Sequence, residues 1–280
     1  MADKRLRKAA TFIGLDLAWS PRNRTGGAVI RNGRLIASSG QLGDNSEIFT
    51  FVATHLAEDA PAVVAVDAPL RVPNESGSRT ADRALSRDWR RFQAGALPTN
   101  RTLLGRMNRP QKSVGERENE PREPVVRGEQ LVEMLVRRLR FSEEVPVPKQ
   151  SAIRTVCEVF PHPAHVSLFG LEKTLKYKAR SGRSYEERWA AFEVYQRHLR
   201  TLRKADPPLK KTKALLCNVD VRMLRGKALK EYEDRLDAIT CAYVASYVWH
   251  HGPRLTRLYG SASEGHILVP LTKPMRRRLK

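Results

Sequence analysis

A short apolar run near the start of the chain, Thr11 to Trp19, carries a single acidic residue, Asp16. A run this short and this apolar is typical of a strand that is buried on both faces. An ionised carboxylate on such a strand costs on the order of several kcal/mol unless a cation or hydrogen-bond donors face it. Asp16 therefore needs a partner, and the two candidates are a metal ion and one of the many arginines of the chain.

A second apolar run repeats this pattern. Residues 62–66 are all apolar, and Asp67 follows them directly. Because functional groups lie at the carboxyl ends of parallel strands, an acid at this point is well placed for chemistry. If the two strands are neighbours, Asp16 and Asp67 meet at one edge of the sheet. Two like charges at that range require a divalent cation between them or a proton on one of them.

Three antiparallel strands are expected at the start of the chain. Residues 28–31 alternate as a strand, Asn32-Gly33 is a strong type I′ hairpin signal, and residues 34–38 form the returning strand. With the run that contains Asp16, these strands make a meander. Apolar residues at helical spacing then predict an amphipathic helix over 46–57.

A polar loop over residues 74–83 leads into a helix and contains three charged residues close together, Arg79, Asp82 and Arg83. One interpretation is a solvent-exposed ladder of ion pairs, and the other is a face that contacts a substrate.

Two segments are expected to be basic and flexible. Residues 95–127 are rich in Arg, Asn, Pro and Gly without usable periodicity, which predicts a basic insertion or a loop that orders on a nucleic acid. Residues 273–280 read as a flexible basic tail. The segments 255–259 and 266–271 before it predict two short peripheral strands.

A third apolar strand is expected over residues 155–160 and carries one acid, Glu158. Since a strand that ends in proline need not be central, Glu158 is also compatible with an exposed position on an edge strand. His162 and His165 follow, three residues apart. The proline between them, Pro163, argues against a helical pair of metal ligands, and zinc sites usually show further His or Cys at matching spacing.

The last long helix is expected over residues 231–251 and carries Asp234 and Asp237 one turn apart. Small residues on one face allow this helix to lie close against a sheet; they are Ala238, Cys241, Ala242 and Ala245. The two acids either reach the strand ends or simply complement the helix dipole near its N-terminus.

The net charge of the chain indicates the class of partner. Lys and Arg number 51 against 30 Asp and Glu, which gives a formal charge of +21 and a pI near 10.4. Such an excess indicates a polyanionic partner, most often nucleic acid, and no long apolar stretch supports a membrane-bound protein.

The three cysteines, Cys157, Cys217 and Cys241, form no C-x-x-C motif, so a reducing cytosol is expected. Residues 1–10 do not read as a signal peptide.

Hard oxygen ligands from several separate segments suit Mg²⁺ or Mn²⁺. The segments GLDLAW, VDAPL, PNESGSRTADR, EVFPHP and RLDA occur in this order between about Ile13 and Pro270. In them the chain resembles the family catalogued as domain of unknown function 429, whose members are regarded as nucleases of the ribonuclease H-like superfamily.

The resemblance implies a fold and a set of site residues. The fold is an α/β, ribonuclease H-like, mixed five-stranded sheet, with an antiparallel three-strand meander plus parallel strands, flanked by helices in a single domain over residues 1–280. Asp16 would be the ligand shared by two metal ions, and Asp67 would bind one of them. Asp237, and with it Asp234, would close the second site. Glu158 would be either a further ligand or the partner of Arg79.

The same resemblance implies a substrate and a reaction. Arg79 would hold a phosphate, and Asn74 and Arg83 in the same matched segment are further candidate substrate-binding residues. The expected activity is hydrolysis of phosphodiester bonds in DNA or RNA by a cytoplasmic nuclease that uses Mg²⁺ or Mn²⁺. The sequence indicates no oligomeric state.

Two other classes stay open. Gly26-Gly27 in the first hairpin faintly resembles the phosphate loop of sugar kinases and actin-like ATPases, although those proteins repeat the fold twice and this chain has one meander. The other class is a nucleic-acid-binding protein without catalysis, which the positive charge alone would serve.

Overall fold

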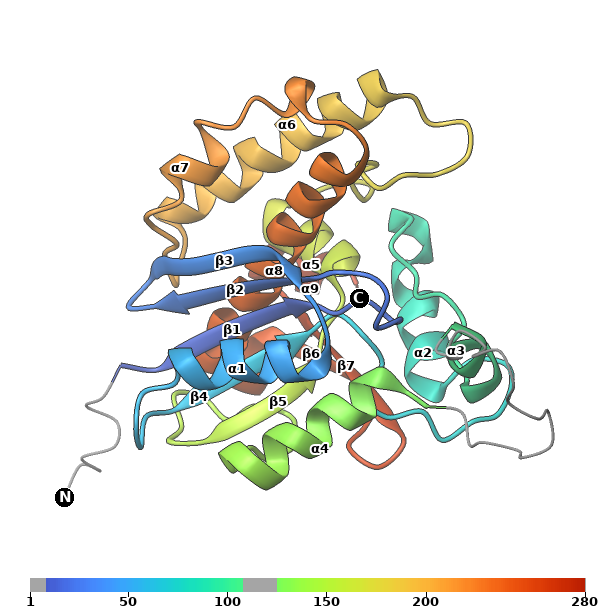
Figure 1. Cartoon of the computed structure of the whole chain (residues 1–280), viewed down its shortest axis with the longest axis vertical. Helices are drawn as coiled ribbons and strands as arrows, with labels where there is room; N and C mark the ends of the chain where they lie inside the picture. The colour runs from blue at the N-terminus through green and yellow to red at the C-terminus, as the bar shows by residue number, and fades with distance from the viewer. Residues whose placement is uncertain (1–8, 108–124, 280) are drawn as a thin grey trace, which may run out of the picture.

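The structure, a computed structural model, describes residues 9–107 and 125–279. A five-stranded sheet lies at its centre, and a separate two-stranded hairpin packs beside it (Figure 1). The strands of the larger sheet are β1 (Thr11–Asp16), β2 (Thr25–Arg31), β3 (Arg34–Leu42), β4 (Ala62–Val66) and β5 (Arg154–Glu158), and those of the hairpin are β6 (Thr256–Ser261) and β7 (Gly265–Pro270).

The larger sheet is mixed, in the order β3-β2-β1-β4-β5. β1, β2 and β3 are antiparallel neighbours, whereas β1, β4 and β5 run parallel to one another. The turn between β2 and β3 has positive φ at both central residues, Asn32 (52°) and Gly33 (64°), as a type I′ hairpin requires. The predicted α/β fold is confirmed, and the arrangement is consistent with a ribonuclease H-like sheet.

Helices cover both faces of this sheet (Figure 1). Alternate residues of each central strand point to opposite faces, so Phe12 of β1 packs with one core and Ile13 with the other. This two-sided burial explains why β4 and the middle of β1, residues 12–15, are apolar throughout. The helices are α1 (Asn45–His55), α2 (Thr80–Trp89), α3 (Arg101–Met107), α4 (Arg127–Leu139), α5 (Pro161–Phe169), α6 (Tyr185–Thr201), α7 (Lys213–Leu216), α8 (Gly226–His251) and α9 (Lys273–Arg278), and a 3₁₀ turn, Leu202–Lys204, follows α6.

α8 crosses the sheet at unusually short range. A Cβ atom on Gly14 of β1 would lie 2.1 Å from the carbonyl oxygen of Ala238, and one on Gly26 of β2 would lie 2.0 Å from that of Asp234. Gly40 of β3 faces the carbonyl oxygen of Glu231 in the same way, at 2.3 Å. The small face of the helix thus meets glycines on three strands, which confirms the predicted close approach.

The start of α8 differs from the prediction. The helix begins at Gly226 rather than near residue 231. Asp234 and Asp237 therefore lie more than two turns inside it, beyond the first turn on which the dipole acts. The dipole does not explain these two acids, and the alternative interpretation, that they reach the strand ends, is the one that the contacts of α8 support.

Two segments that were expected to be irregular contain helices. Residues 273–278 form α9, whose N-cap Thr272 accepts a hydrogen bond from the Met275 amide at 3.3 Å and whose Met275 side chain is buried. The prediction of a flexible tail is therefore wrong for these residues, and Lys280 lies outside the described residues. β7 is likewise buried along its whole length rather than peripheral.

Within the predicted basic insertion, residues 101–107 form α3, and its Leu104 is buried against Val72 and Val126. Residues 108–124 lie outside the described part of the chain, as do residues 1–8, so the rest of that prediction is not tested. Among the described helices, none is long and apolar enough to cross a membrane.

Candidate functional site

The carboxyl ends of the parallel strands bring two acids together. Asp16 is the last residue of β1, and Asp67 directly follows β4. The register pairs Leu15 with Val66, and the Asp67 amide donates to the Leu15 carbonyl oxygen at 2.8 Å. Asp16 and Asp67 are therefore next to each other at one edge of the sheet, as the sequence predicted.

Two further aspartates reach the same edge from α8. Asp16 pairs with Gly26 across the β1–β2 ladder, and the absent side chain of Gly26 is what lets the backbone of Asp234 approach. Asp237 lies one turn further along the helix and is fully buried. We refer to Asp16, Asp67, Asp234 and Asp237 as the carboxylate cluster.

Burial and mutual repulsion dominate the electrostatics of the carboxylate cluster. Burial raises the pKa of Asp16 well above its usual value; Lys178 opposes this rise, whereas the charges of Asp237, Asp67 and Asp234 add to it. Burial likewise raises the pKa of Asp67 to about 7. Burial also raises the pKa of Asp234, although the charge of Lys230 and hydrogen bonds with Lys230 and Asp16 oppose this rise. Carboxyl groups this close share protons unless a cation lies among them.

Asp237 is held in one orientation by two tyrosines and a lysine. Its Oδ1 accepts hydrogen bonds from the Tyr177 hydroxyl at 2.7 Å and the Tyr195 hydroxyl at 3.1 Å. Its Oδ2 lies 2.9 Å from Lys178 Nζ. Burial raises the pKa of Asp237, but the interactions with Lys178, His165 and Tyr177 together outweigh burial and leave that pKa below its usual value. Asp237 is therefore an ionised, preoriented carboxylate.

Lys178 is the cation at the centre of this arrangement. Burial lowers the pKa of its ammonium, but Asp237, Asp16 and Asp67 together raise that pKa well above the usual value. Lys230 of α8 plays a similar part at the other side, at 2.6 Å from Asp234 Oδ1. The positive charge that acts on Asp16 in this structure is that of Lys178, whose own ion pair is with Asp237.

The carboxylate oxygens of the cluster are ligands of the kind that a hard divalent cation prefers, but in this structure Lys178 is paired with one of them. The cluster offers only carboxylate oxygens, which Mg²⁺ and Mn²⁺ prefer. Among the described residues, Asp237 Oδ2 accepts no well-aligned hydrogen bond, and the ammonium of Lys178 is its ion-pair partner. Within residues 9–107 and 125–279, no group of three His, Cys, Asp or Glu side chains is arranged to hold a metal ion. In this structure Lys178 therefore occupies the Oδ2 side of Asp237.

Glu158 belongs to a different charged group. Its Oε1 lies 2.6 Å from Arg79 NH2, its Oε2 lies 2.8 Å from Arg79 NH1, and Arg79 NH2 also donates to Asp82 Oδ1 at 2.8 Å. All three side chains are buried. We call these residues the Arg79 triad. Of the two expected roles of Glu158, partner of Arg79 is the one observed.

The Arg79 triad also corrects two expectations. β5 is an edge strand, but Glu158 is buried rather than exposed, because the hairpin residue His266 lies behind it and its Nε2 accepts from the Glu158 amide at 3.2 Å. Arg79 and Asp82 do not form a solvent-exposed ladder. Both guanidinium edges of Arg79 are engaged within the protein, so a phosphate would have to displace a carboxylate to reach them.

The other two candidate substrate-binding residues lie outside the carboxylate cluster. Asn74 donates to the carbonyl oxygens of Ser76 and Thr99, both at 2.9 Å, and so fixes its own loop. Arg83 is exposed on α2 and donates to the Ser78 carbonyl oxygen.

His162 and His165 lie on a helix after all. Both prolines of α5, Pro161 and Pro163, fall within its first turn, where a missing amide hydrogen is tolerated. His165 Nε2 pairs with the Tyr195 hydroxyl at 2.7 Å, and His162 Nδ1 with the Thr174 hydroxyl at 2.9 Å. Burial lowers their pKa values, to about 3 for His165 and about 4 for His162. Both are neutral, hydrogen-bonded side chains in this structure.

Packing accounts for the glycine pair that resembled a phosphate loop. Gly26 accommodates α8, and a Cβ atom on Gly27 would lie 2.7 Å from Leu42 and 2.9 Å from Phe51. Neither glycine needs a phosphate to explain it.

Tyr177 and Lys178 are among the site residues that sequence reasoning missed, as are Tyr195 and Lys230. Tyr177 and Lys178 lie in the loop between α5 and α6, which has no periodicity, and the only available signal was a tyrosine next to a lysine in a basic segment. The same loop forms most of the wall of a cleft of about 440 Å³. Lys178 lines this cleft and also contacts Asp237, so the cleft and the carboxylate cluster share a wall.

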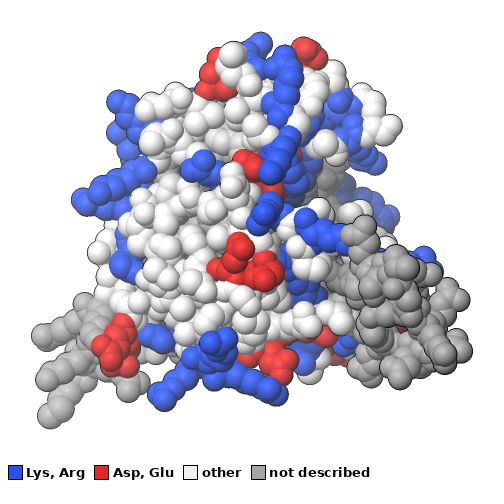
Figure 2. Space-filling view, viewed as in Figure 1, with Lys and Arg blue, Asp and Glu red and all other residues white. Residues whose placement is uncertain are grey.

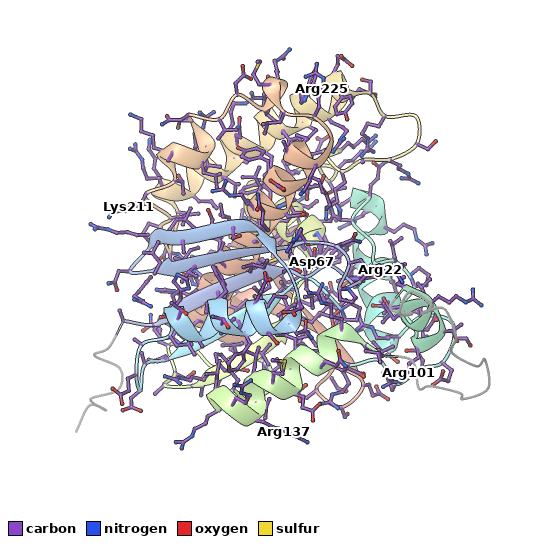
Figure 3. The ribbon with its side chains drawn as sticks, in the orientation of Figure 1. Arg22, Asp67, Arg101, Arg137, Lys211 and Arg225 are labelled. Atoms are coloured by element: carbon purple, nitrogen blue, oxygen red, sulfur yellow. The ribbon has the colours of Figure 1, made fainter. Side chains whose placement is uncertain are left out.

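Side-chain charges on the molecule are mostly positive. Figure 2 shows Lys and Arg around most of the visible outline, with Asp and Glu in small separate groups. In Figure 3, Asp67 lies near the middle of the view, whereas Lys211 lies at the opposite end of β2 and β3.

Comparison with known proteins gives one result. A family model described as protein of unknown function (DUF429) matches residues 14–262, and the chain belongs to this family. Searches of the curated proteins and of the solved structures return no match.

Proposed function

We propose that the protein is a nuclease of ribonuclease H-like descent that hydrolyses phosphodiester bonds of nucleic acid with the help of Mg²⁺ or Mn²⁺. The observation that carries this proposal is the convergence of four aspartates from β1, β4 and α8 at one edge of the sheet. A buried group of like charges is costly, and such groups are concentrated at functional sites. The strand order supports the proposed descent.

In this proposal Asp16, Asp67 and Asp237 hold the metal ions, and Asp234 completes the site. Bound divalent cations lower the pKa of a coordinated water and stabilise the leaving oxygen of a phosphodiester. The protein's own part is orientation: Tyr177 and Tyr195 fix Asp237.

The surface charge supports a nucleic acid as the substrate. A formal charge of +21 attracts a polyanion and accelerates its encounter with the protein. Cys157, Cys217 and Cys241 are all free thiols, which accords with the proposed cytoplasmic location.

The test is a cleavage assay on labelled single-stranded, duplex, hybrid and branched substrates, with Mg²⁺, with Mn²⁺ and with chelator. We expect cleavage that requires the metal. Asp16→Asn and Asp67→Asn should each reduce turnover by at least about 10²–10³-fold, as for loss of groups that act in the transition state, and leave substrate binding intact.

Asp59→Asn is the matched control for these variants. Asp59 is exposed in a turn with φ 52°, a conformation that asparagine tolerates well. Cleavage that survives in Asp16→Asn and Asp67→Asn, or that is equally impaired in Asp59→Asn, would contradict the proposal.

A second candidate is a nucleic-acid-binding protein without catalysis. The observation that favours it is Lys178, whose ammonium already compensates the carboxylate cluster. The same assay separates the two: this candidate predicts salt-dependent affinity for the substrates and no cleavage with either metal.

A further inference from the structure

The cleft of about 440 Å³ next to the carboxylate cluster is lined by cations. Four of its lining side chains are basic, and none is acidic. The basic residues are Lys176, Lys178, Arg180 and Arg183, and the other polar lining residues are Gln93, His162 and Thr174.

The partners of these cations leave two of them uncompensated. Lys178 is paired with Asp237, and Arg183 donates to the Lys178 carbonyl oxygen at 2.6 Å, which fixes the loop. Lys176 and Arg180 are exposed, and within the described residues their side chains make no hydrogen bond or ion pair. Their charges therefore face the cleft without a counter-charge.

Size and charge together specify the kind of ligand. Four like charges around one cleft repel one another, which is electrostatically unfavourable. An anion bound in the cleft attracts all four and makes the electrostatic energy favourable. Phosphate oxygens accept strong, charge-assisted hydrogen bonds from Arg and Lys. The volume lies within the range of ligand sites, so it accommodates a nucleotide unit.

We propose that this cleft is a phosphate-binding subsite that takes one phosphate of the substrate strand next to the bond that is cleaved. The inference rests on the proposed function for its substrate, a nucleic-acid strand. Arg180 and Lys176 bind the phosphate from the open side, and Arg183 keeps the loop in place.

Lys178 couples this subsite to the carboxylate cluster. Its ammonium neutralises Asp237 when no other cation is present. Asp16, Asp67 and Asp237 would hold a divalent cation, whose charge would free the Lys178 ammonium to contact the phosphate in the cleft. Because binding coupling is reciprocal, a phosphate in the cleft equally favours divalent-cation binding.

The first experiment measures binding without metal. Inorganic phosphate and a 5′-phosphorylated single-stranded decanucleotide are titrated at fixed ionic strength into the wild type and the double variant Lys176→Gln/Arg180→Gln. The matched control is Arg203→Gln/Lys204→Gln, an equal loss of charge in the exposed 3₁₀ turn beyond α6. The control turn follows the C-terminal end of α6, a 17-residue helix about 25 Å long, whereas the cleft loop precedes its N-terminal end in the sequence.

We expect the cleft variant to weaken binding of both probes at least about tenfold, and the control to weaken it by less than about twofold, because only the cleft cations contact the phosphate. Equal weakening in both variants would show that general charge attraction binds the probes and would overturn the subsite. Normal circular dichroism and melting temperature of the exposed variants exclude misfolding as the cause.

The second experiment tests the coupling with Lys178→Gln. Addition of Mg²⁺ should raise the phosphate affinity of the wild type about fivefold or more, and should leave that of Lys178→Gln unchanged. An equal Mg²⁺ effect in the two proteins would overturn the coupling.

These binding results stand apart from catalysis. Selective loss of phosphate binding in the cleft variant, together with no cleavage by the wild type, keeps the subsite and rejects the nuclease. Metal-dependent cleavage, together with unaltered phosphate binding in the cleft variant, keeps the nuclease and rejects the subsite.

Discussion

Two buried groups of charges lie near the carboxyl ends of the parallel strands, and they are built differently. In the Arg79 triad, one guanidinium binds two carboxylates through four hydrogen bonds between 2.6 and 3.2 Å, and the Leu70 amide adds a bond to Glu158. In the carboxylate cluster, four aspartates face two lysines, and repulsion among the acids raises the pKa of Asp16 and Asp67 beyond the effect of burial.

In the proposed function, this difference separates a structural ion-pair network, the Arg79 triad, from a ligand-binding one, the carboxylate cluster. A buried network in which every donor and acceptor is paired stabilises one conformation and has no polar group left to bind a ligand. An unbalanced network costs stability in the free protein and gains it back when a cation or ligand binds. Burial of acids alone does not distinguish the two, since Glu158 and Asp237 are both buried.

The largest expected effect comes from breaking the Arg79 triad. Arg79→Met should reduce the free energy of unfolding by about 3–5 kcal/mol, because it leaves Glu158 and Asp82 buried without their cation. Urea denaturation followed by circular dichroism measures this loss. Arg83→Met, on the exposed face of the same helix, is the control. A loss no larger than that of the control would show that Arg79 is not a structural residue.

A smaller loss is expected from Tyr177→Phe in the carboxylate cluster. Tyr177 donates to the charged Asp237, so its removal should cost about 1.5–3 kcal/mol, the usual value for a hydrogen bond to an ionised group. Tyr243→Phe is the control, because the equally buried Tyr243 hydroxyl donates at 2.8 Å to the neutral Pro207 carbonyl oxygen. That variant should lose only about 0.5–1.5 kcal/mol. Equal losses in urea denaturation would show that Asp237 is not ionised.

Neutralising an acid of the carboxylate cluster should increase the free energy of unfolding, in contrast to the two losses above. Asp67 accepts no side-chain hydrogen bond from the described residues and is repelled by Asp237. Asp67→Asn should therefore raise the free energy of unfolding in metal-free buffer by up to about 1 kcal/mol. Asp82→Asn in the Arg79 triad should lower it, since Asp82 accepts from Arg79. Destabilisation by both substitutions would remove the distinction between the two groups.

Most of the fold follows from local patterns. The apolar runs of β1 and β4, the Asn32-Gly33 turn and the spacing of α1 each depend on residues close together in the sequence, and each is found near its predicted position. The position of Asp16 next to Asp67 follows from the rule that parallel strands end at one edge.

What the sequence left open depends on contacts between distant segments. The approach of α8 requires Gly14 and Gly26 on different strands, and no local pattern marks them as its partners. Lys178 reaches Asp237 from a loop without periodicity. The pairing of Glu158 with Arg79 joins residues 79 positions apart. Such contacts arise only when the whole fold is assembled.

The smallest expected effect concerns His266, which lies against the Arg79 triad. Burial, with help from Arg79 and Arg71, lowers its pKa to about 4, and its Nε2 must be unprotonated to accept from the Glu158 amide. Below the unfolded pKa of about 6.5, the unfolded chain binds a proton that the folded protein does not, so stability falls as the pH falls from 6.5 towards 4.

His266→Gln keeps an acceptor for the Glu158 amide but does not titrate. At pH 6 the wild type should have lost on the order of 1 kcal/mol through His266, relative to pH 7.5, and the variant should lack this part of the loss. Urea denaturation of both proteins at the two pH values measures the difference, in which the contributions of His162 and His165 cancel. Parallel pH curves for the two proteins would mean that folding does not lower the pKa of His266, and that this side of the Arg79 triad is open to water rather than closed by the hairpin.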